Sequence, residues 1–268
     1  MSVLIISSQR DIAAQNIAQE LIQTRNFQSV PGSSDVLLQN GDIFLKHVDT
    51  DSVYTDDLGV DFRPEVVIFA SRHRSESGEP SLTVHWTGNP TSRADLGGNP
   101  KSLSFTDPPR LRAALLALDE AREARQLNYA VTMEATHHGP TELGVPTLFV
   151  EIGSGEEQWK DRQAASAVSE AIWVAATSPN QGKVAVGFGG GHYSNKHCNG
   201  IRKDGYAFSH ILSKYFFEEY DEEIIHMAFE RTRGECRTAV IDWKGVRGPD
   251  RARLLDTLKK MGVEVIRV

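Results

Sequence analysis

Short apolar runs alternate along this chain with longer segments whose apolar residues recur at helical spacing. The runs at residues 3–7 and 66–70 are apolar at successive positions, which is typical of strands buried on both faces. Residues 12–24 show the helical spacing, and Asp11 stands before them as an N-cap. The same two patterns predict strands at 82–86, 129–133, 147–152, 183–188, 238–242 and 263–268, and helices at 111–126, 156–177, 222–231 and 250–261.

Strands that alternate with helices predict an α/β fold with a mostly parallel central sheet and helices on both of its faces. Residues 35–48 carry an Asn40-Gly41 turn between two apolar runs, which predicts a β-hairpin inserted early in the chain. No internal repeat and no low-complexity linker divides the sequence. We therefore expect a single α/β domain that spans residues 1–268.

The composition is that of an ordinary globular protein, with 40% hydrophobic and 24% charged residues in a chain of 268. No apolar run approaches the roughly 18–20 residues that a membrane span needs, and the N-terminus lacks the basic region of a secretory signal. Two cysteines, Cys198 and Cys236, are too few for a disulfide framework. These features favour a cytoplasmic protein without a membrane partner. No sequence feature indicates an obligate protein partner, so we expect a monomer.

The net charge of −7 argues against a general nucleic-acid binder. The charge is unevenly distributed, however, because residues 231–268 hold ten Lys and Arg against five Asp and Glu. Such asymmetry allows one basic surface to meet phosphates while the rest stays acidic. Short segments also vary this much by chance.

Polar residues that suit catalysis follow most of the expected strands. In a doubly wound sheet the loops at the carboxyl ends of the strands converge on one crevice, so these segments predict a shared site. Six of the nine histidines lie in or beside them. The segments are 71–75 (SRHRS), 85–89 (HWTGN), 134–140 (EATHHGP), 151–155 (EIGSG) and 189–198 (GGGHYSNKHC).

Each candidate also has a structural interpretation. His137 and His138 point to opposite sides of an extended segment, and a pair of this kind is often part of a surface loop unless the chain turns. Glu151 lies inside an apolar strand, where a carboxylate is either functional or held in a structural ion pair. The three glycines at 189–191 lack the spacing of a phosphate-binding motif. They favour close backbone approach to a ligand, with His192 directly after them.

The residue pattern favours hydrolysis by one of two routes. No G-x-S-x-G motif is present, which lowers the expectation of a serine hydrolase. A histidine tuned by a carboxylate can act as a general base on water. Alternatively, a zinc ion held by three His or Glu ligands lowers the pKa of bound water to about 7. The surplus of histidines modestly favours zinc.

Several stretches of the sequence resemble the archaeal-and-plant type of D-aminoacyl-tRNA deacylase. The motifs at 134–140 (EATHHGP) and 187–193 (GFGGGHY) are quite specific, and the likeness extends from the first expected strand to the last. The other matching stretches are SRHRSESGEPSLTVH at 71–85, FVEIGS at 149–154 followed by Gln158-Trp159, HILSKY at 210–215 and DWKG at 242–245.

This resemblance implies an enzyme that hydrolyses the ester between a D-amino acid and the 3′-terminal ribose of tRNA, and so protects translation. It also implies zinc dependence and a core similar to the peptidyl-tRNA hydrolase and phosphorylase-like α/β folds. It supplies no set of metal ligands, so the roles of individual residues rest on their chemistry.

We assign these roles as expectations. Zinc or a histidine activates water, and a carboxylate accepts the proton or orients an imidazole. The glycine amides and a cation stabilise the tetrahedral oxyanion, and lysines hold acceptor-stem phosphates. The catalytic candidates are Glu134, His137, Glu151 and His192; the metal ligands are drawn from His73, His137, His138 and His192; and the substrate-binding candidates are Arg74, Gly189, Gly190, Gly191, Lys196 and Lys244.

Two rival functions remain open from sequence. A zinc amidohydrolase or carboxypeptidase acting on a small peptide-like substrate needs the same metal site but no tRNA-binding surface. A non-catalytic RNA-binding module with a vestigial cleft needs the basic surface but none of the histidines.

Overall fold

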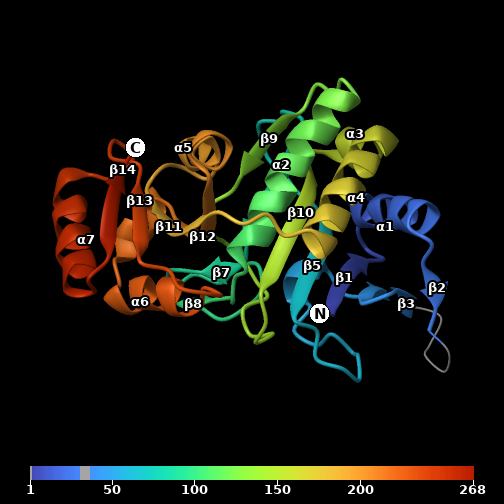
Figure 1. Ribbon diagram of the computed structural model, residues 1–268, viewed down its shortest axis with the longest axis horizontal. Coiled ribbons are helices and arrows are strands. Elements are labelled where there is room, and N and C mark those ends of the chain that lie inside the picture. The colour runs from blue at the N-terminus through green and yellow to red at the C-terminus, as the bar shows by residue number, and fades with distance from the viewer. Residues whose placement is uncertain (1, 31–36) are drawn as a thin grey trace.

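The computed structural model describes residues 2–30 and 37–268, and its larger sheet contains eight strands in the order β2-β3-β4-β1-β5-β10-β6-β9 (Figure 1). β1 pairs in parallel with β4 and β5, and β5 with β10. β6 runs antiparallel to β10, and β9 is parallel to β6. The bounds are β1 Val3–Ser8, β2 Gln28–Ser29, β3 Leu37–Asn40, β4 Ile43–Val48, β5 Val66–Arg72, β6 Ser81–Trp86, β9 Ala130–Met133 and β10 Thr147–Gly153.

β3 and β4 are antiparallel neighbours at one end of this sheet, with Asn40 opposite Ile43. The expected hairpin covered residues 35–48, of which 35 and 36 lie outside the described residues. β4 also pairs with β1 over its whole length, so these two strands extend the main sheet.

One face of the larger sheet is covered by helices and the other by loops. Val3, Ile68 and Leu148 point to the first face, where they pack with residues of α1 (Ile12–Thr24), α2 (Pro108–Ala124) and α4 (Arg162–Thr177). Leu4 and Phe69 point to the second face, and residues 58–62 and 143–145 cover them. The expectation of helices on both faces is therefore wrong for this sheet.

The carboxyl-terminal third of the chain forms a second, fully parallel sheet, in the order β12-β11-β13-β14, where one central sheet was expected. β13, α7 and β14 form the expected βαβ unit at the end of the chain. Buried side chains of α6 and α7 pack on this sheet with Phe188 and Ile241. The bounds are β11 Lys183–Phe188, β12 Tyr206–Leu212, β13 Thr238–Ile241, β14 Glu264–Arg267, α6 Glu222–Glu230 and α7 Gly248–Lys260.

The helix α2 joins the two sheets, because it contacts β6 and β9 of the first and β12 of the second. Figure 1 shows it in the middle of the molecule, with α7 at one end and α1 near the other. The remaining elements are the short pair β7 Gly88–Asn89 and β8 Ser102–Leu103, the helices α3 Glu156–Trp159 and α5 Asn195–Asn199, and the helical turns η1 Ser52–Tyr54, η2 Gly200–Asp204 and η3 Lys214–Glu219.

The helix predicted at residues 156–177 is interrupted. Asp161 stands between α3 and α4, and its carboxylate accepts hydrogen bonds from the amides of Gln163 and Ala164. A side chain that caps free amide groups in this way starts a new helix, so the break between α3 and α4 is explained by Asp161. Within the described residues, no helix is long and apolar enough to cross a membrane.

Candidate active site

The alternation of side chains along β6 and β10 places polar groups on the loop-covered face of the larger sheet. Leu82, Val84 and Trp86 point into the helix-covered core, so Thr83 and His85 point the other way. Glu151 lies opposite Thr83 on the neighbouring strand. His85 is completely buried and Glu151 nearly so, so both groups need partners there.

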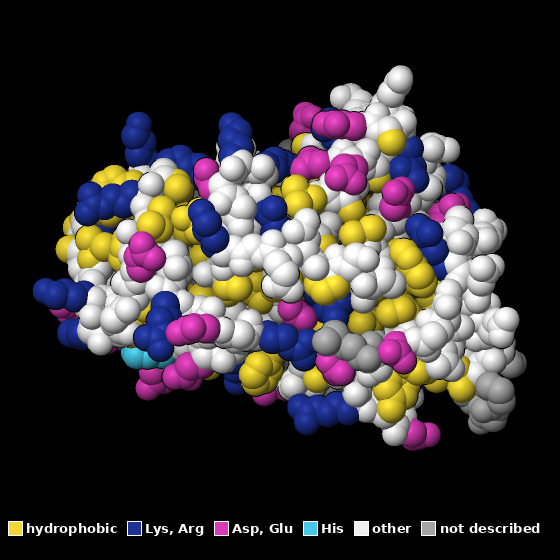
Figure 2. Space-filling view, viewed as in Figure 1, with side chains coloured by type: hydrophobic (Ala, Val, Ile, Leu, Met, Phe, Trp, Pro, Cys, Tyr) yellow, Lys and Arg dark blue, Asp and Glu magenta, His cyan; other side chains and the backbone are white. Residues whose placement is uncertain are grey.

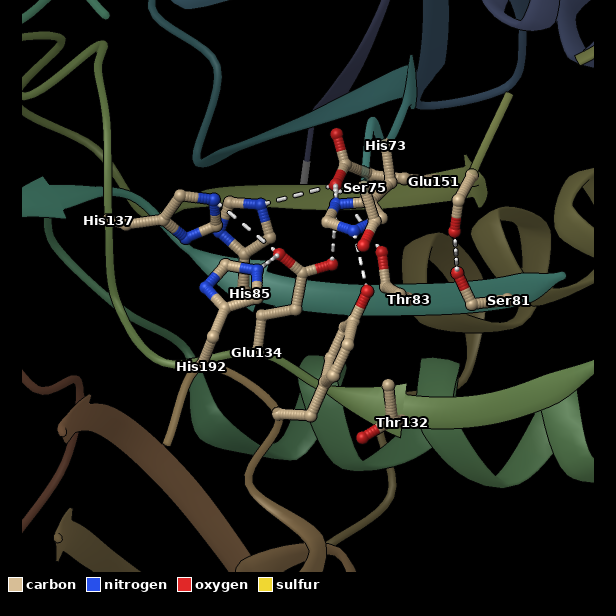
Figure 3. Close-up of polar contacts among 12 residues, drawn as sticks. His73, Ser75, Ser81, Thr83, His85, Thr132, Glu134, His137, Glu151 and His192 are labelled. Atoms are coloured by element: carbon tan, nitrogen blue, oxygen red, sulfur yellow. Dashed lines mark hydrogen bonds and ion pairs between the residues drawn. The ribbon is translucent and has the colours of Figure 1, made fainter. Parts of the chain in front are cut away.

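Glu134 is the centre of the site, and histidines from three different segments approach its carboxylate (Figure 3). Its Oε1 lies 3.1 Å from Nδ1 of His73, which follows β5. Its Oε2 lies 2.9 Å from Nε2 of His192 and 3.4 Å from Nε2 of His137. The residue is only 1% exposed, so these imidazoles provide most of the polar surroundings of its carboxylate.

A second carboxylate, Glu151, lies beside the first. Its Oε2 is 3.5 Å from Nε2 of His85 and 3.8 Å from Nδ1 of His73. Thr83 also donates a hydrogen bond to this oxygen over 3.3 Å. His73 therefore lies between the two carboxylates, which links the Glu151 strand to the Glu134 loop.

His85, His137 and His138 form a compact group that fits a metal ion. One ring nitrogen of each lies within 4.8 Å of the others. In all three rings Nδ1 is within hydrogen-bond distance of a backbone carbonyl, at Trp86, Ala135 and Gly139 respectively. Carbonyls that engage Nδ1 leave Nε2 as the lone-pair nitrogen, as in protein zinc sites. Nε2 of His85 and both oxygens of Glu134 are buried, and their nearest polar partners are other side chains of this cluster.

The charges of these groups also suit a cation. Burial lowers the pKa of His137 well below its usual value and that of His138 to about 3, helped by repulsion from His85. Burial opposes ionisation of His85 too, but the hydrogen-bonded Glu151 outweighs it and raises the pKa of His85. Burial would raise the pKa of Glu134, yet the hydrogen bond from His192 and the other imidazoles hold it well below its usual value. The field of the two carboxylates thus favours a positive charge among the imidazoles.

Two hollows open onto the histidines, and His137, His138, His192 and Leu96 line both. We call the larger one, of about 500 Å³, the polar hollow; its other lining residues include Asp11, Asp51, Arg72, Arg74 and Glu151. We call the smaller one, of about 240 Å³, the aromatic hollow; its other lining residues include Asn89, Ser213, Tyr215 and Phe216. A substrate can therefore approach the cluster from two sides.

The fold brings together all the residues that were expected to act as catalysts or metal ligands. His73, Glu134, His137, Glu151 and His192 are joined by the contacts above, and the ring of His138 lies 4.4 Å from that of His137. Their roles in catalysis and metal binding remain predictions.

The candidates for substrate binding are spread over several places in the structure. Arg74 lines the polar hollow. The amide of Gly189 donates to the carbonyl of Leu212, so it is not free to bind an oxyanion, contrary to expectation. Lys196 pairs with Asp242 at 3.0 Å, which weakens its attraction for phosphates.

The other three candidates line a separate hollow of about 500 Å³, which we call the basic hollow. Gly190, Gly191 and Lys244 belong to its wall, together with Lys214, Tyr215, Phe217, Glu218, Gly245, Val246, Arg247 and Asp250. Neither glycine lines the two hollows at the histidines.

Two members of the cluster lie in segments that the sequence singled out but received no role there. His85 lies in the strand predicted at 82–86. Polar residues at 81, 83 and 85 alternate there with apolar ones, and this alternation predicts that His85 lies on a polar face of the strand. Tyr193 was passed over beside His192, and its hydroxyl lies 2.8 Å from Nε2 of His73. No periodic signal points to a tyrosine in an irregular loop.

Comparison with known proteins agrees with the sequence motifs. The sequence model of the D-aminoacyl-tRNA deacylase family matches residues 60–266. A D-aminoacyl-tRNA deacylase from Methanosarcina acetivorans is 37% identical, over 99% of this chain and 92% of that protein. One from Pyrococcus furiosus is 36% identical, over 98% and 99%. A crystal structure of a conserved protein of unknown function matches with a TM-score of 0.90 at 32% identity, over 99% of this chain and 95% of that one. The chain therefore belongs to the D-aminoacyl-tRNA deacylase family.

Proposed function

We propose that this chain hydrolyses the ester bond of D-aminoacyl-tRNA, releasing the free D-amino acid and tRNA, and that the histidine cluster around Glu134 performs the chemistry. The observation that carries the proposal is the set of contacts between one buried carboxylate and His73, His137 and His192. Family membership supplies the substrate class, and the cluster supplies groups that accept and donate protons.

Glu134 accepts the proton of the attacking water. Its low pKa keeps it ionised at neutral pH, and its Oε2 faces both His192 and His137. As the water oxygen bonds to the ester carbonyl carbon, one water proton passes to Glu134. Removing a proton during attack typically contributes a factor of about 10²–10⁴ to the rate.

His192 delivers a proton to the leaving ribose oxygen. Its side chain is 40% exposed, the most exposed of the imidazoles that contact Glu134, and it lines both hollows. When the tetrahedral intermediate collapses, the carbonyl–ribose C–O bond breaks, Nε2 of His192 gives its proton to the departing oxygen, and the proton that Glu134 took from water passes to Nε2. Arg74, in the wall of the polar hollow, stabilises the negative charge on the carbonyl oxygen.

His85, His137 and His138 would hold a zinc ion through their Nε2 atoms. A bound zinc ion lowers the pKa of a coordinated water and polarises an ester carbonyl. The support for this ligand set is the engaged Nδ1 of each ring and the spacing of the three rings, one nitrogen of each lying within 4.8 Å of the others. It differs from the ligands expected from sequence, because His73 and His192 group with Glu134 instead.

We also propose a fold likeness, an oligomeric state and a cellular location for this chain. The core resembles the peptidyl-tRNA hydrolase and phosphorylase-like folds, the chain acts as a monomer, and it works in the cytoplasm, where aminoacylated tRNA is used.

Paired substrates test the proposed function. D-tyrosyl-tRNA and L-tyrosyl-tRNA are incubated separately with the protein, and the release of tyrosine is followed over time. We expect hydrolysis of the D-ester at a rate far above that of the L-ester. An amidohydrolase or carboxypeptidase would cleave neither ester selectively, and a non-catalytic RNA-binding module would bind both without releasing tyrosine.

A further inference from the structure

The aromatic hollow and the basic hollow share Tyr215 as a wall residue. The aromatic hollow also contains His192 and His137, so Tyr215 stands between the histidine cluster and the basic hollow. A ligand that extends from the cluster along this side therefore passes Tyr215 before it reaches Lys244.

The second sheet explains why these hollows adjoin. β11, β12 and β13 are parallel neighbours, so the loops that follow them lie side by side. The loop after β11 gives Gly190 and Gly191 to the basic hollow and its next residue, His192, to the aromatic hollow. Successive Cα atoms are about 3.8 Å apart, so the two hollows are close at this loop.

Glycine makes this approach of loops possible. A Cβ added to Gly245, in the loop after β13, would lie 2.3 Å from the amide nitrogen of Gly190. The amides of Gly190 and Gly191 donate no hydrogen bond within residues 2–30 and 37–268, and both residues line the basic hollow.

The basic hollow carries cations that carboxylates do not neutralise. Among the described residues, neither Lys214 nor Lys244 has a carboxylate oxygen within 4.0 Å, whereas Arg247 pairs with Asp250. Glu218 also lines the hollow. With Arg247 and Asp250 paired, the two lysines outweigh this single carboxylate and leave the wall with an excess of one positive charge. Figure 2 shows Lys and Arg side chains, in dark blue, on the end of the molecule that carries α7.

Tyr215 is unusually placed for an aromatic residue. The residue is 52% exposed, and Nζ of Lys214 lies 5.1 Å from the centre of its ring. An exposed ring beside lysines is the arrangement with which proteins bind single-stranded nucleic acid, because the ring stacks on a base while the cations attract the backbone.

We infer that the single-stranded 3′ end of tRNA lies across these two hollows, with the terminal base stacked on Tyr215 and the phosphate on its 5′ side held by Lys244 and Lys214. This inference rests on the proposed function, because the ester at the histidine cluster fixes where the strand ends. The order of features along the surface matches the order of ester, base and phosphate along the strand.

Phosphate binding is tested by comparing two substrates. Lys244→Gln and Lys214→Gln are assayed with D-tyrosyl-tRNA and with D-tyrosyl adenosine, an ester without a phosphate. We expect the double variant to lower kcat/KM for the tRNA relative to the adenosine ester by about tenfold, mostly through KM. The slope of log(kcat/KM) against log[salt] should become shallower by roughly one for each lysine removed.

Two further variants sharpen this test. Glu218→Gln removes the carboxylate from the same wall, so it should shift the tRNA-to-adenosine ratio in the opposite direction. Lys259→Gln is a matched control, because eleven helical positions separate Lys259 from Gly248 at the start of α7, about 16 Å along the axis. The inference is overturned if Lys259→Gln and the double variant change the ratio equally, or if neither changes it.

Base stacking is tested at Tyr215. Tyr215→Ala should raise KM for both substrates by about fivefold or more, and Tyr215→Phe should retain nearly normal values because the ring remains. Equal behaviour of the two variants would overturn the stacking role. Fluorescence anisotropy with an oligonucleotide ending in CCA provides a binding readout that does not depend on turnover. If the wild-type protein binds this oligonucleotide through Tyr215 and Lys244 but cleaves neither ester, the proposed function fails and the binding inference stands.

Discussion

The hydroxyl of Tyr193 lies 2.8 Å from Nε2 of His73, while Nδ1 of the same ring lies 3.1 Å from Glu134. Because Glu134 is ionised, Nδ1 of a neutral His73 carries the proton and donates to it, and Nε2 accepts from the tyrosine hydroxyl. The carboxylate of Glu134, which can only accept, thus fixes the tautomer of His73, and Tyr193 holds the orientation of a ring that lies against both carboxylates.

Tyr193→Phe should lower kcat by roughly tenfold with little change in KM, since it removes one orienting hydrogen bond without opening a cavity. Steady-state kinetics with D-tyrosyl-tRNA measures this. Tyr129→Phe is the matched control, because its hydroxyl donates to Asp161 outside the site. Equal kinetics in Tyr193→Phe and wild type would show that Tyr193 does not position His73.

His138→Ala should abolish tight zinc binding, whereas His192→Ala should keep it. The first substitution removes one of three proposed ligands, and the second removes a ring that faces Glu134. Zinc per chain is measured by elemental analysis after dialysis against zinc-free buffer. The reverse result would place the ion among His73, Glu134 and His192.

Removal of the metal from the unmodified protein is a separate prediction. Dialysis against a chelator should abolish hydrolysis of D-tyrosyl-tRNA, and added zinc should restore it. Calcium, which prefers oxygen ligands, should not restore activity at the same concentration. Full turnover in protein shown to be metal-free would leave Glu134 and the histidines as the complete catalytic apparatus.

His197 should make the protein less stable in mild acid. Burial lowers the pKa of His197 from 6.5 to about 4, and its Nε2 lies 3.2 Å from the carbonyl of Val240. The unfolded chain therefore binds a proton below about pH 6.5 that the folded chain refuses until about pH 4, so stability is lost as pH falls through this window. The free energy of unfolding of His197→Gln, relative to that of the wild type, should therefore rise by about 3 kcal/mol between pH 7 and pH 4. Urea unfolding at both pH values measures the difference, and a constant difference contradicts the argument.

Asp11 connects the first helix to the strand that leads to His73. One carboxylate oxygen caps α1 through the amides of Ala13 and Ala14, and the other accepts from the amide of Arg72. Asp11→Ala should lower the free energy of unfolding by about 1–3 kcal/mol, and Asp11→Asn by less, because asparagine still caps a helix. Urea denaturation checks the ranking, and an undiminished stability in Asp11→Ala would refute it.

Local patterns predicted most of the individual elements. Asp11 caps the helix at residues 12–24 as expected, and β11 occupies the predicted residues 183–188. The strand β12 was missed because Ser209 and His210 interrupt its apolar run. Both side chains are buried and bonded to distant partners, with Ser209 joined to Thr106 and His210 to Ser104. Sequence periodicity carries no information about such long-range partners.

The gathering of the site was predictable in outline but not in detail. Polar residues after successive strands indicated a shared crevice, and the structure places Glu134 against His73 and His192 there. Two sheets contribute to the site, since His192 follows β11 of the second sheet. In the loop of three glycines, the amide of Gly189 donates a hydrogen bond to Leu212, whereas the amides of Gly190 and Gly191 donate none within the described residues. Local sequence does not encode this difference, because it depends on a contact with a distant strand.

The most direct test of the central claim is single-turnover hydrolysis of D-tyrosyl-tRNA by Glu134→Gln, which keeps the size of the side chain and removes its charge. The account predicts a rate at least about a hundredfold below that of the wild type, with the fold preserved by circular dichroism. Glu142→Gln, at an exposed carboxylate that accepts from Ser102, should react at the wild-type rate. A Glu134→Gln protein that hydrolyses the ester as fast as the wild type would contradict the account.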